Sequence, residues 1–172
     1  AEYETITDPL HPKSLHITQG AIDIHRIKFS YASASQKGLR VPVFDDLTIH
    51  ITGGEQVGIV GLSGAGKSTL ASLLLRFDEI DKGSITIDGI DIREVRQSDL
   101  RQQIAYVPQE PLLFHRTIRE NIVYYNTQIG EAEMIQAAKA AHAHEFIEKL
   151  SDGYDTMVGE RGIKLSGGQK QR

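Results

Sequence analysis

Residues 61–68 read Gly61-Leu62-Ser63-Gly64-Ala65-Gly66-Lys67-Ser68, which fits the pattern G-x-x-x-x-G-K-[S/T] of a phosphate-binding loop. Glycines at these positions let backbone N–H groups turn inward around anionic oxygens, which Cβ atoms would obstruct. The stretch lies between a short apolar run and an amphipathic helical pattern, which is the context that the motif requires. It predicts a site for a nucleoside triphosphate. The alternative is a glycine-rich turn that only caps a helix.

The polar residues of the loop each have an expected role at such a site. A helix beginning at Gly66 offers its positive dipole end and its unpaired N–H groups to the phosphates. Lys67 is a point charge that can reach the β- and γ-phosphates, and the Ser68 hydroxyl is an oxygen ligand suited to Mg²⁺. The predicted contacts to the nucleotide from this part of the chain are Gly61, Ser63, Gly64, Gly66, Lys67, Ser68 and Thr69.

Three strands are predicted on the N-terminal side of the loop. Residues 22–29 and 43–51 show apolar runs typical of strands, with a polar hairpin or loop between them. A turn at 52–55 leads into residues 56–60, which are uncharged and rich in β-branched residues. That composition predicts a strand buried on both faces.

Helical patterns dominate the rest of the chain, so the sequence predicts an α/β class with an all-helical last third. Caps, turns and periodicity give the boundaries of each element. The predicted elements are a helix at 67–77, a hairpin at 84–92 turning at Asp88-Gly89, a helix at 99–103 capped by Ser98, a strand at 104–107, a helix at 118–122 capped by Thr117, a helix at 131–150, and a helix starting near Gly167.

The composition excludes several classes of protein. The 172 residues carry 19 Lys and Arg against 23 Asp and Glu, and this net charge of −4 argues against broad electrostatic binding to nucleic acid. Without cysteine there is no disulfide framework, thiolate zinc site or cysteine nucleophile. No apolar run of about 18 residues is present, and the acidic start has no signal-peptide pattern. We therefore expect a soluble intracellular domain.

A second motif, Leu165-Ser166-Gly167-Gly168-Gln169, repeats the chemistry of the first. A serine hydroxyl and glycine amides at a helix N-terminus form an anion site. Two phosphate sites about a hundred residues apart suggest a nucleotide bridged between two subunits.

With these two motifs, residues 21–172 resemble the nucleotide-binding domain of an ATP-binding cassette (ABC) transporter. The resemblance implies a P-loop NTPase core with an antiparallel β subdomain and a helical subdomain at about 109–168, incomplete at the C-terminus. Residues 1–20 would then be a linker from a membrane domain. ATP and Mg²⁺ are the implied ligands.

The resemblance also implies roles for residues outside the loop. Tyr31 matches the aromatic residue that stacks on adenine, although it could be an ordinary loop tyrosine. Gln109 matches the glutamine that contacts Mg²⁺ and the attacking water, which places it with Lys67 in the catalytic group and with Ser68 in the metal site. In a head-to-tail dimer with a second nucleotide-binding domain, the signature motif would face the partner's nucleotide through Ser166, Gly167, Gly168 and Gln169.

Residues 156–162 resemble a loop specific to exporters. In such proteins Glu160 and Arg161, with the Gln109 region, would face coupling helices of the transmembrane domain at the cytoplasmic face of the inner membrane. No nucleic-acid partner is expected. Met157 departs from the family pattern, where an acidic residue is common, and Phe114-His115-Arg116 departs from a serine-glycine pair.

Three residues that the family uses for hydrolysis have no counterpart between Ala1 and Arg172. They are the Asp that binds Mg²⁺ at the end of an apolar strand, the Glu that activates water, and a later His. Loss of a general base typically lowers rates by about 10²–10⁴-fold. We expect weak nucleotide binding, negligible turnover and exposed apolar surface beside the loop. The alternatives are a regulatory ATP-binding fragment without turnover and a soluble ABC ATPase without a transport role.

Overall fold

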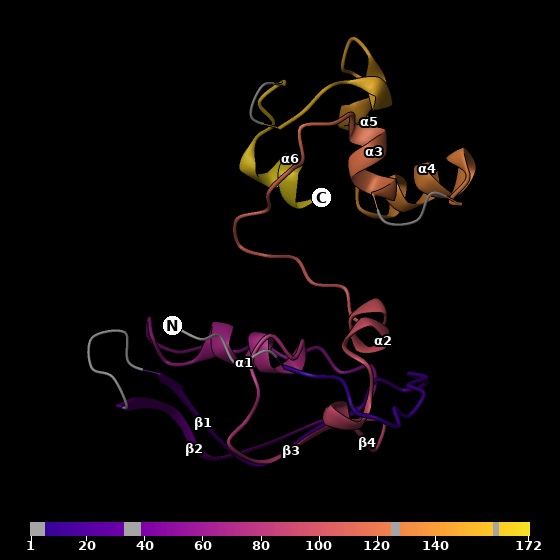
Figure 1. Cartoon of the computed structure of the whole chain (residues 1–172). Helices are drawn as coiled ribbons and strands as arrows, with labels where there is room; N and C mark the ends of the chain where they lie inside the picture. The colour runs from indigo at the N-terminus through magenta and orange to yellow at the C-terminus, as the bar shows by residue number, and fades with distance from the viewer. Residues whose placement is uncertain (1–5, 33–38, 125–127, 160–161) are drawn as a thin grey trace. The chain divides into compact units, whose positions relative to one another are not determined.

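The computed structural model describes residues 6–32, 39–124, 128–159 and 162–172 (Figure 1). The chain divides into two compact units, Ala1–Ala105 and Tyr106–Arg172, and each has its own cluster of buried apolar residues. We call them unit 1 and unit 2. Within the described residues, no helix has the length and apolar character needed to span a bilayer.

Unit 1 is built on an antiparallel sheet of four strands in the order β2-β1-β3-β4. Asp88 (φ 48°) and Gly89 (φ 79°) form the turn of its second hairpin, and two left-handed residues are typical of a type I′ turn. The predicted hairpin at 84–92 is therefore confirmed, and β1 and β2 pair antiparallel as well. The strands are β1 (Ile22–Ala32), β2 (Arg40–Ile51), β3 (Lys82–Ile87) and β4 (Ile90–Asp91).

A bulge in β1 keeps its apolar residues on one face of the sheet. Ile24 and Ile27 are both buried, and the register of β1 against β2 and β3 shifts between them. Residues three apart point to opposite faces of a regular strand, so the extra residue of the bulge realigns them. Gly83 of β3 fits against this bulge, because a Cβ there would lie 2.5 Å from the carbonyl oxygen of His25.

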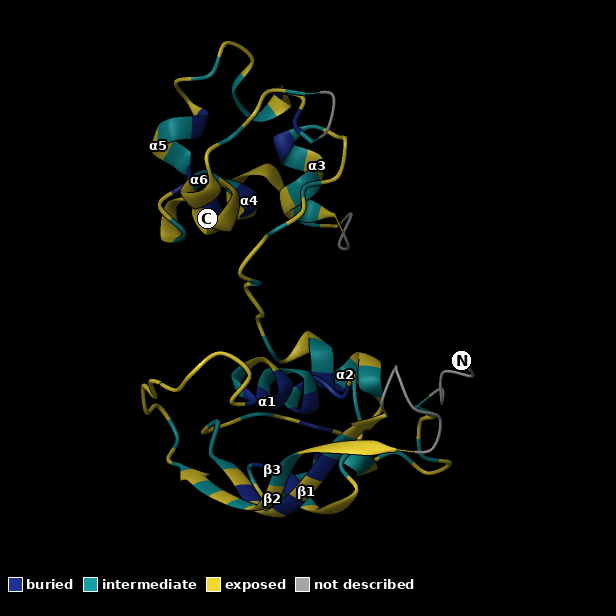
Figure 2. Cartoon of the chain, turned by 90° about the vertical axis from the view of Figure 1, so that its left-hand side faces the viewer, coloured by how far each residue is buried: buried dark blue, intermediate teal, exposed yellow. Residues whose placement is uncertain are grey.

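Two helices cover one face of this sheet, α1 (Lys67–Leu74) and α2 (Gln97–Gln102) (Figure 2). A short 3₁₀ turn, η1 (Ile92–Glu94), follows β4. The helices and the sheet share one core because the apolar stripe of each helix faces the apolar side of the strands. The buried members include Leu70, Leu73 and Leu100 from the helices and Ile24, Ile27, Phe29, Ile85 and Ile87 from the sheet.

The two strands predicted beside the phosphate-binding loop are not formed, and these predictions are wrong. Residues 56–60 and 104–107 belong to none of the described strands. Val57 is 47% exposed, Ile59 is 52% exposed and Val60 is 93% exposed. A strand buried on both faces needs neighbours that hydrogen-bond along its edges, and no described strand pairs with either segment. The apolar surface expected beside the loop is therefore present.

Three helix boundaries also differ from the predictions. Helix α1 ends at Leu74 rather than near Phe77, because Arg76 turns into the left-handed region at φ 50°. Helix α2 begins after Arg96, so Ser98 is not its cap. The predicted helix at 131–150 is interrupted at residues 141–143, where His142 has a φ of 53°.

Unit 2 consists of short helices around a small apolar cluster. Thr117 caps α3 with a complete capping box, in which its side chain accepts from the Glu120 N–H, as the sequence predicted. An apolar groove of about 440 Å³ lies among these helices and includes Leu113, Ile118 and Phe146 in its lining. The elements are α3 (Ile118–Val123), α4 (Glu131–Ala140), α5 (His144–Ile147), η2 (Gly153–Asp155) and α6 (Gly167–Gln171).

Residues 6–21, which we call the N-terminal segment, lie against the rest of unit 1. Leu15 is buried in its core, and Lys13 pairs with Glu94 at 2.7 Å. The Asp88 carboxylate accepts hydrogen bonds from the N–H groups of Thr18 (2.7 Å), Gln19 (3.0 Å) and Ala21 (2.8 Å). The N–H groups of Gln19 and Thr18 are the main reason that the pKa of Asp88 lies well below its usual range. One carboxylate therefore holds the end of the segment to the β3–β4 turn.

Replacing Asp88 by asparagine is expected to lower the thermal unfolding midpoint at pH 7, because the amide has one acceptor oxygen where the carboxylate has two. The native pKa is depressed, so the stabilisation is fully present above the unfolded pKa of about 3.9 and is lost as the pH falls below it. Thermal unfolding followed by circular dichroism should therefore show that the difference in unfolding midpoint between the two proteins becomes smaller below about pH 4. The control Asp45→Asn removes an exposed ion pair with Lys28 and should have little effect. A gap for Asp88→Asn that is constant from pH 7 to 3 would contradict the expectation.

Candidate nucleotide-binding site

The phosphate-binding loop is an open turn that leads directly into α1. Gly64 (φ 82°) and Gly66 (φ 90°) both have left-handed backbones, and the Ala65 N–H donates to the Leu62 carbonyl oxygen at 3.1 Å. A side chain at either glycine would strain this backbone. Gly61 and Ser63 belong to the same exposed turn.

The first turn of α1 presents backbone donors that no group of the helix satisfies. Gly66 is the N-cap residue and offers no side-chain cap, and the first turn contains no acidic residue. The Leu70 N–H is the first to reach a helical acceptor, the Gly66 carbonyl oxygen at 2.9 Å. The N–H groups of Lys67, Ser68 and Thr69 precede it and have no acceptor within the helix. They form a donor set that an anion can complete.

Lys67 adds a positive charge at the positive end of this helix dipole. Its Nζ donates to the carbonyl oxygens of Gly61 and Leu62, both at 2.8 Å. These two bonds use two of the three donors of the ammonium group and leave one for a ligand. A cation in the first turn is disfavoured by about 0.3–1 kcal/mol, so the site is electrostatically incomplete until an anion binds.

Side chains of strand β2 pack against the residue at which α1 begins. A Cβ at Gly66 would lie 2.8 Å from the Phe44 ring and 2.9 Å from Val43. Contacts this close require a shift of one partner, and both residues are packed against the core of unit 1. The contact therefore fixes the position at which α1 begins. Nothing in the local sequence distinguishes Phe44 from the other apolar residues of β2, so this role could not be predicted from the sequence.

Tyr31 lies beside the same helix. Its hydroxyl oxygen is 3.4 Å from Thr69 Oγ1 and 3.5 Å from Asp78 Oδ2, and its ring meets Phe29 edge to face at 4.7 Å. Ser72 donates to the same Asp78 oxygen at 2.7 Å. The tyrosine is 39% exposed. The structure thus places Tyr31 beside Thr69, the last residue of the predicted contact set. Asp78, which was not among the predicted site residues, lies beside Tyr31.

Magnesium binding is compatible with what the loop offers. The Ser68 side chain is exposed, and its hydroxyl has no partner within the part of the chain that the structure describes. No group of three or more His, Asp or Glu residues in that part could hold a metal ion. Mg²⁺ is commonly held by one or two protein oxygens together with substrate phosphates and waters, and Ser68 can supply one of them.

The remaining predicted residues lie in unit 2. Gln109 follows Pro108 in an irregular stretch, and its carbonyl oxygen accepts from Gln171 Nε2 at 3.2 Å. Ser166 caps α6 through a capping box: its Oγ accepts from the Gln169 N–H at 3.2 Å, and its own N–H donates to Gln169 Oε1 at 2.9 Å.

The other two signature residues, Gly167 and Gly168, are exposed in the first turn of α6. Met157, which departs from the family pattern, forms a bridge with Thr117. Glu160 and Arg161 lie outside the described residues.

Known proteins match this chain along almost its whole length. A solved bacterial Atm1-family ABC exporter with ATP bound superimposes with a TM-score of 0.84 and 41% identity, covering 96% of this chain and 28% of that chain. The ATP-dependent lipid A-core flippase of Desulfotalea psychrophila is 46% identical over 167 residues, which are 97% of this chain and 28% of the flippase. ABC transporter B family member 14 of Arabidopsis thaliana is 43% identical over 171 residues, 98% of this chain and 13% of that protein.

The chain therefore spans 13% to 28% of the length of these relatives. The sequence profile of the family described as ABC transporter matches residues 44–172, which include the phosphate-binding loop, Gln109 and the signature motif. The mixed helix and strand architecture with an antiparallel sheet is that of the P-loop NTPase domains in this family. The chain belongs to the ABC transporter family.

Proposed function

We propose that this chain is the ATP-binding part of an ABC exporter and binds ATP with Mg²⁺ at residues 61–69. The observation that carries the proposal is the uncapped start of α1, where free backbone donors and the Lys67 ammonium group converge and the first turn holds no acidic residue. Such a site lacks only an anion. The similarity to exporters with ATP-binding domains supports ATP as the source of that anion.

Each loop residue has a role in this proposal. Lys67 binds the β- and γ-phosphates, Ser68 gives a ligand to Mg²⁺, and the Thr69 N–H and hydroxyl lie next to them. The half-exposed Tyr31 stacks on the adenine. Its position beside Thr69 supports this role, because it lies close to the loop.

The second motif acts on a second nucleotide-binding domain. In a head-to-tail dimer, Ser166, Gly167, Gly168 and Gln169 face the nucleotide that the partner holds, and Gln109 contacts Mg²⁺ and the attacking water. The Gln109 region and Glu160/Arg161 transmit closure to the coupling helices of a transmembrane domain at the cytoplasmic face of the membrane. Closure is driven by the higher affinity of ATP for the closed state.

Hydrolysis requires an oriented water and stabilisation of the charge on the transferred phosphoryl group. The family hydrolyses ATP, but the sequence of residues 1–172 has no Asp-Glu pair directly after an apolar run typical of a strand. We therefore expect this chain to bind ATP with negligible turnover.

The proposal is tested by hydrogen exchange and a phosphate-release assay on the same sample. Saturating ATP with Mg²⁺ should slow amide exchange at residues 62–69, and phosphate release should stay at the level of buffer. Unchanged exchange at residues 62–69 would contradict the binding site. Turnover comparable to that of an intact ABC transporter would contradict the expected lack of hydrolysis.

A further inference from the structure

The end of α1 opposite the phosphate-binding loop is held by an unusual residue. Arg76 follows the helix at the position where the chain turns left-handed, with a φ of 50°. Its N–H donates to the Leu73 carbonyl oxygen at 3.1 Å, and the Phe77 N–H donates to the Ser72 carbonyl oxygen at 2.9 Å. These two bonds form a Schellman motif, whose left-handed position is usually occupied by glycine. The backbone of an arginine is strained at this position, so its side-chain contacts must offset the strain.

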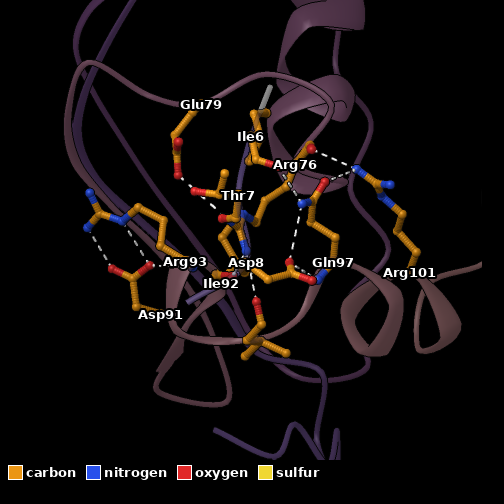
Figure 3. A network of polar contacts seen from close by, with 11 residues as sticks. Ile6, Thr7, Asp8, Arg76, Glu79, Asp91, Ile92, Arg93, Gln97 and Arg101 are labelled. Atoms are coloured by element: carbon orange, nitrogen blue, oxygen red, sulfur yellow. Dashed lines mark hydrogen bonds and ion pairs between the residues drawn. The ribbon is translucent and has the colours of Figure 1, made fainter. Parts of the chain in front are cut away.

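The guanidinium group of Arg76 is buried and joins three separate segments (Figure 3). The residue is 2% exposed, and Nη1 donates to the carbonyl oxygens of Val95 at 2.8 Å and Ile92 at 3.2 Å. Nη2 donates to the Thr7 carbonyl oxygen at 3.4 Å and lies 3.6 Å from Glu79 Oε1. Nε is buried and has no partner among the described residues. Burial of a cation with one unpaired donor is costly, so the stability of this arrangement depends strongly on the hydrogen bonds that the other donors make.

Helix α2 holds the same end of α1 from its other side. Arg101 donates from Nε to the Leu75 carbonyl oxygen at 2.9 Å and from Nη2 to the Arg76 carbonyl oxygen at 2.8 Å. The same Nη2 reaches Gln97 Oε1 at 2.9 Å. The carbonyl groups of the two residues that follow α1 are therefore both satisfied by one arginine.

Residues 6–8 of the N-terminal segment attach to this network through polar groups. The Gln97 N–H donates to Asp8 Oδ1 at 2.9 Å, and Gln97 Nε2 donates to the Ile6 carbonyl oxygen at 2.9 Å. Thr7 and Asp8 are exposed, and Leu15 is the first residue of the segment that is buried in the core. Residues 6–8 are therefore held mainly by polar contacts, and none of them belongs to the apolar core cluster.

We infer that docking of residues 6–8 on Arg76 and Gln97 raises the affinity of the phosphate-binding loop for nucleotide, with Arg76 as a positioning residue. Helix α1 has eight residues and is about 12 Å long, so a shift at its last turn moves the donors at its first turn. By thermodynamic linkage, nucleotide must in return stabilise the docked segment by the same factor. This inference rests on the proposed function, because it concerns the affinity of the same site.

The test uses Asp8→Ala. The carboxylate that it removes is exposed and belongs to the network at the end of α1 opposite the loop. Its ATP affinity should fall about fivefold, the lower end of the usual range for coupling between sites. The matched control is Lys13→Ala, which breaks the ion pair of the same segment with Glu94 but leaves Arg76 and Gln97 untouched. Its affinity for ATP should equal that of the unaltered chain.

The amide of Gln97 gives a second readout that a purely structural role of Asp8 would not move. Gln97 is the first residue of α2, so its N–H has no acceptor within the helix, and its partner is Asp8. ATP should slow its hydrogen exchange about fivefold in the unaltered chain and not in Asp8→Ala. Equal ATP affinity of Asp8→Ala and the unaltered chain would overturn this inference alone. Absence of ATP binding by the unaltered chain would overturn the proposed function and this inference with it.

Discussion

Lys67→Met is expected to weaken ATP binding by about 10- to 100-fold while the fold is retained. The change keeps the apolar stem and removes the ammonium group, and hydrogen bonds to charged groups contribute about 1.5–3 kcal/mol. The loss falls on binding because Lys67 has one donor left for the phosphates after its bonds to Gly61 and Leu62. Titration with a fluorescent ATP analogue, displaced by ATP, gives the affinities of both proteins.

The control for Lys67→Met is Lys82→Met, at the exposed start of β3. It removes the same charge from the same unit, so long-range electrostatics change similarly while the loop is untouched. Its affinity for ATP should stay within about twofold of the unaltered chain, since distant exposed charges are screened by salt. Equal affinities for Lys67→Met and Lys82→Met would show that Lys67 does not bind phosphate.

Gly66→Ala is expected to destabilise unit 1 by about 2–5 kcal/mol and to impair nucleotide binding. The new Cβ would lie 2.8 Å from Phe44, and overpacking of this kind typically costs about 1–3 kcal/mol. The backbone at φ 90° adds strain for any residue other than glycine. Urea unfolding followed by circular dichroism measures the loss.

Gly64→Ala separates the two causes, because Gly64 has a similar φ of 82° but its Cβ would meet no atom within 4 Å. It should show the backbone strain alone, about 1–2 kcal/mol. In the double variant Gly66→Ala/Phe44→Leu, the smaller side chain should restore part of the loss. If Gly66→Ala were as stable as Gly64→Ala, the support of the loop by β2 would be refuted.

Local patterns predicted the elements whose structure depends on nearby residues. The Asp88-Gly89 turn and the Thr117 cap formed as expected, because such structures depend on residues close in sequence. The break at residues 141–143 was missed because alanines on both sides of His142 favour continuation of the helix.

Elements that depend on distant partners could not be predicted. Residues 56–60 have the composition of a buried strand, but composition does not supply the neighbouring strand that would bury them. The carbonyl groups that bind Arg76 come from Thr7, Ile92 and Val95, and backbone acceptors leave no trace in the sequence. For the site, the loop was derived from its own residues, whereas the role of Tyr31 came from the family resemblance.

The most direct test of the account is calorimetric titration of the unaltered chain with ATP and, separately, with AMP, both with Mg²⁺. The donors at the start of α1 and the Lys67 ammonium group recognise the β- and γ-phosphates, so binding should depend on them. ATP should bind with one site per chain, and AMP should bind at least about tenfold more weakly, a difference of about 1.4 kcal/mol. Equal affinity for ATP and AMP, or no heat of binding with ATP, would contradict the claim that residues 61–69 form a binding site for a nucleoside triphosphate.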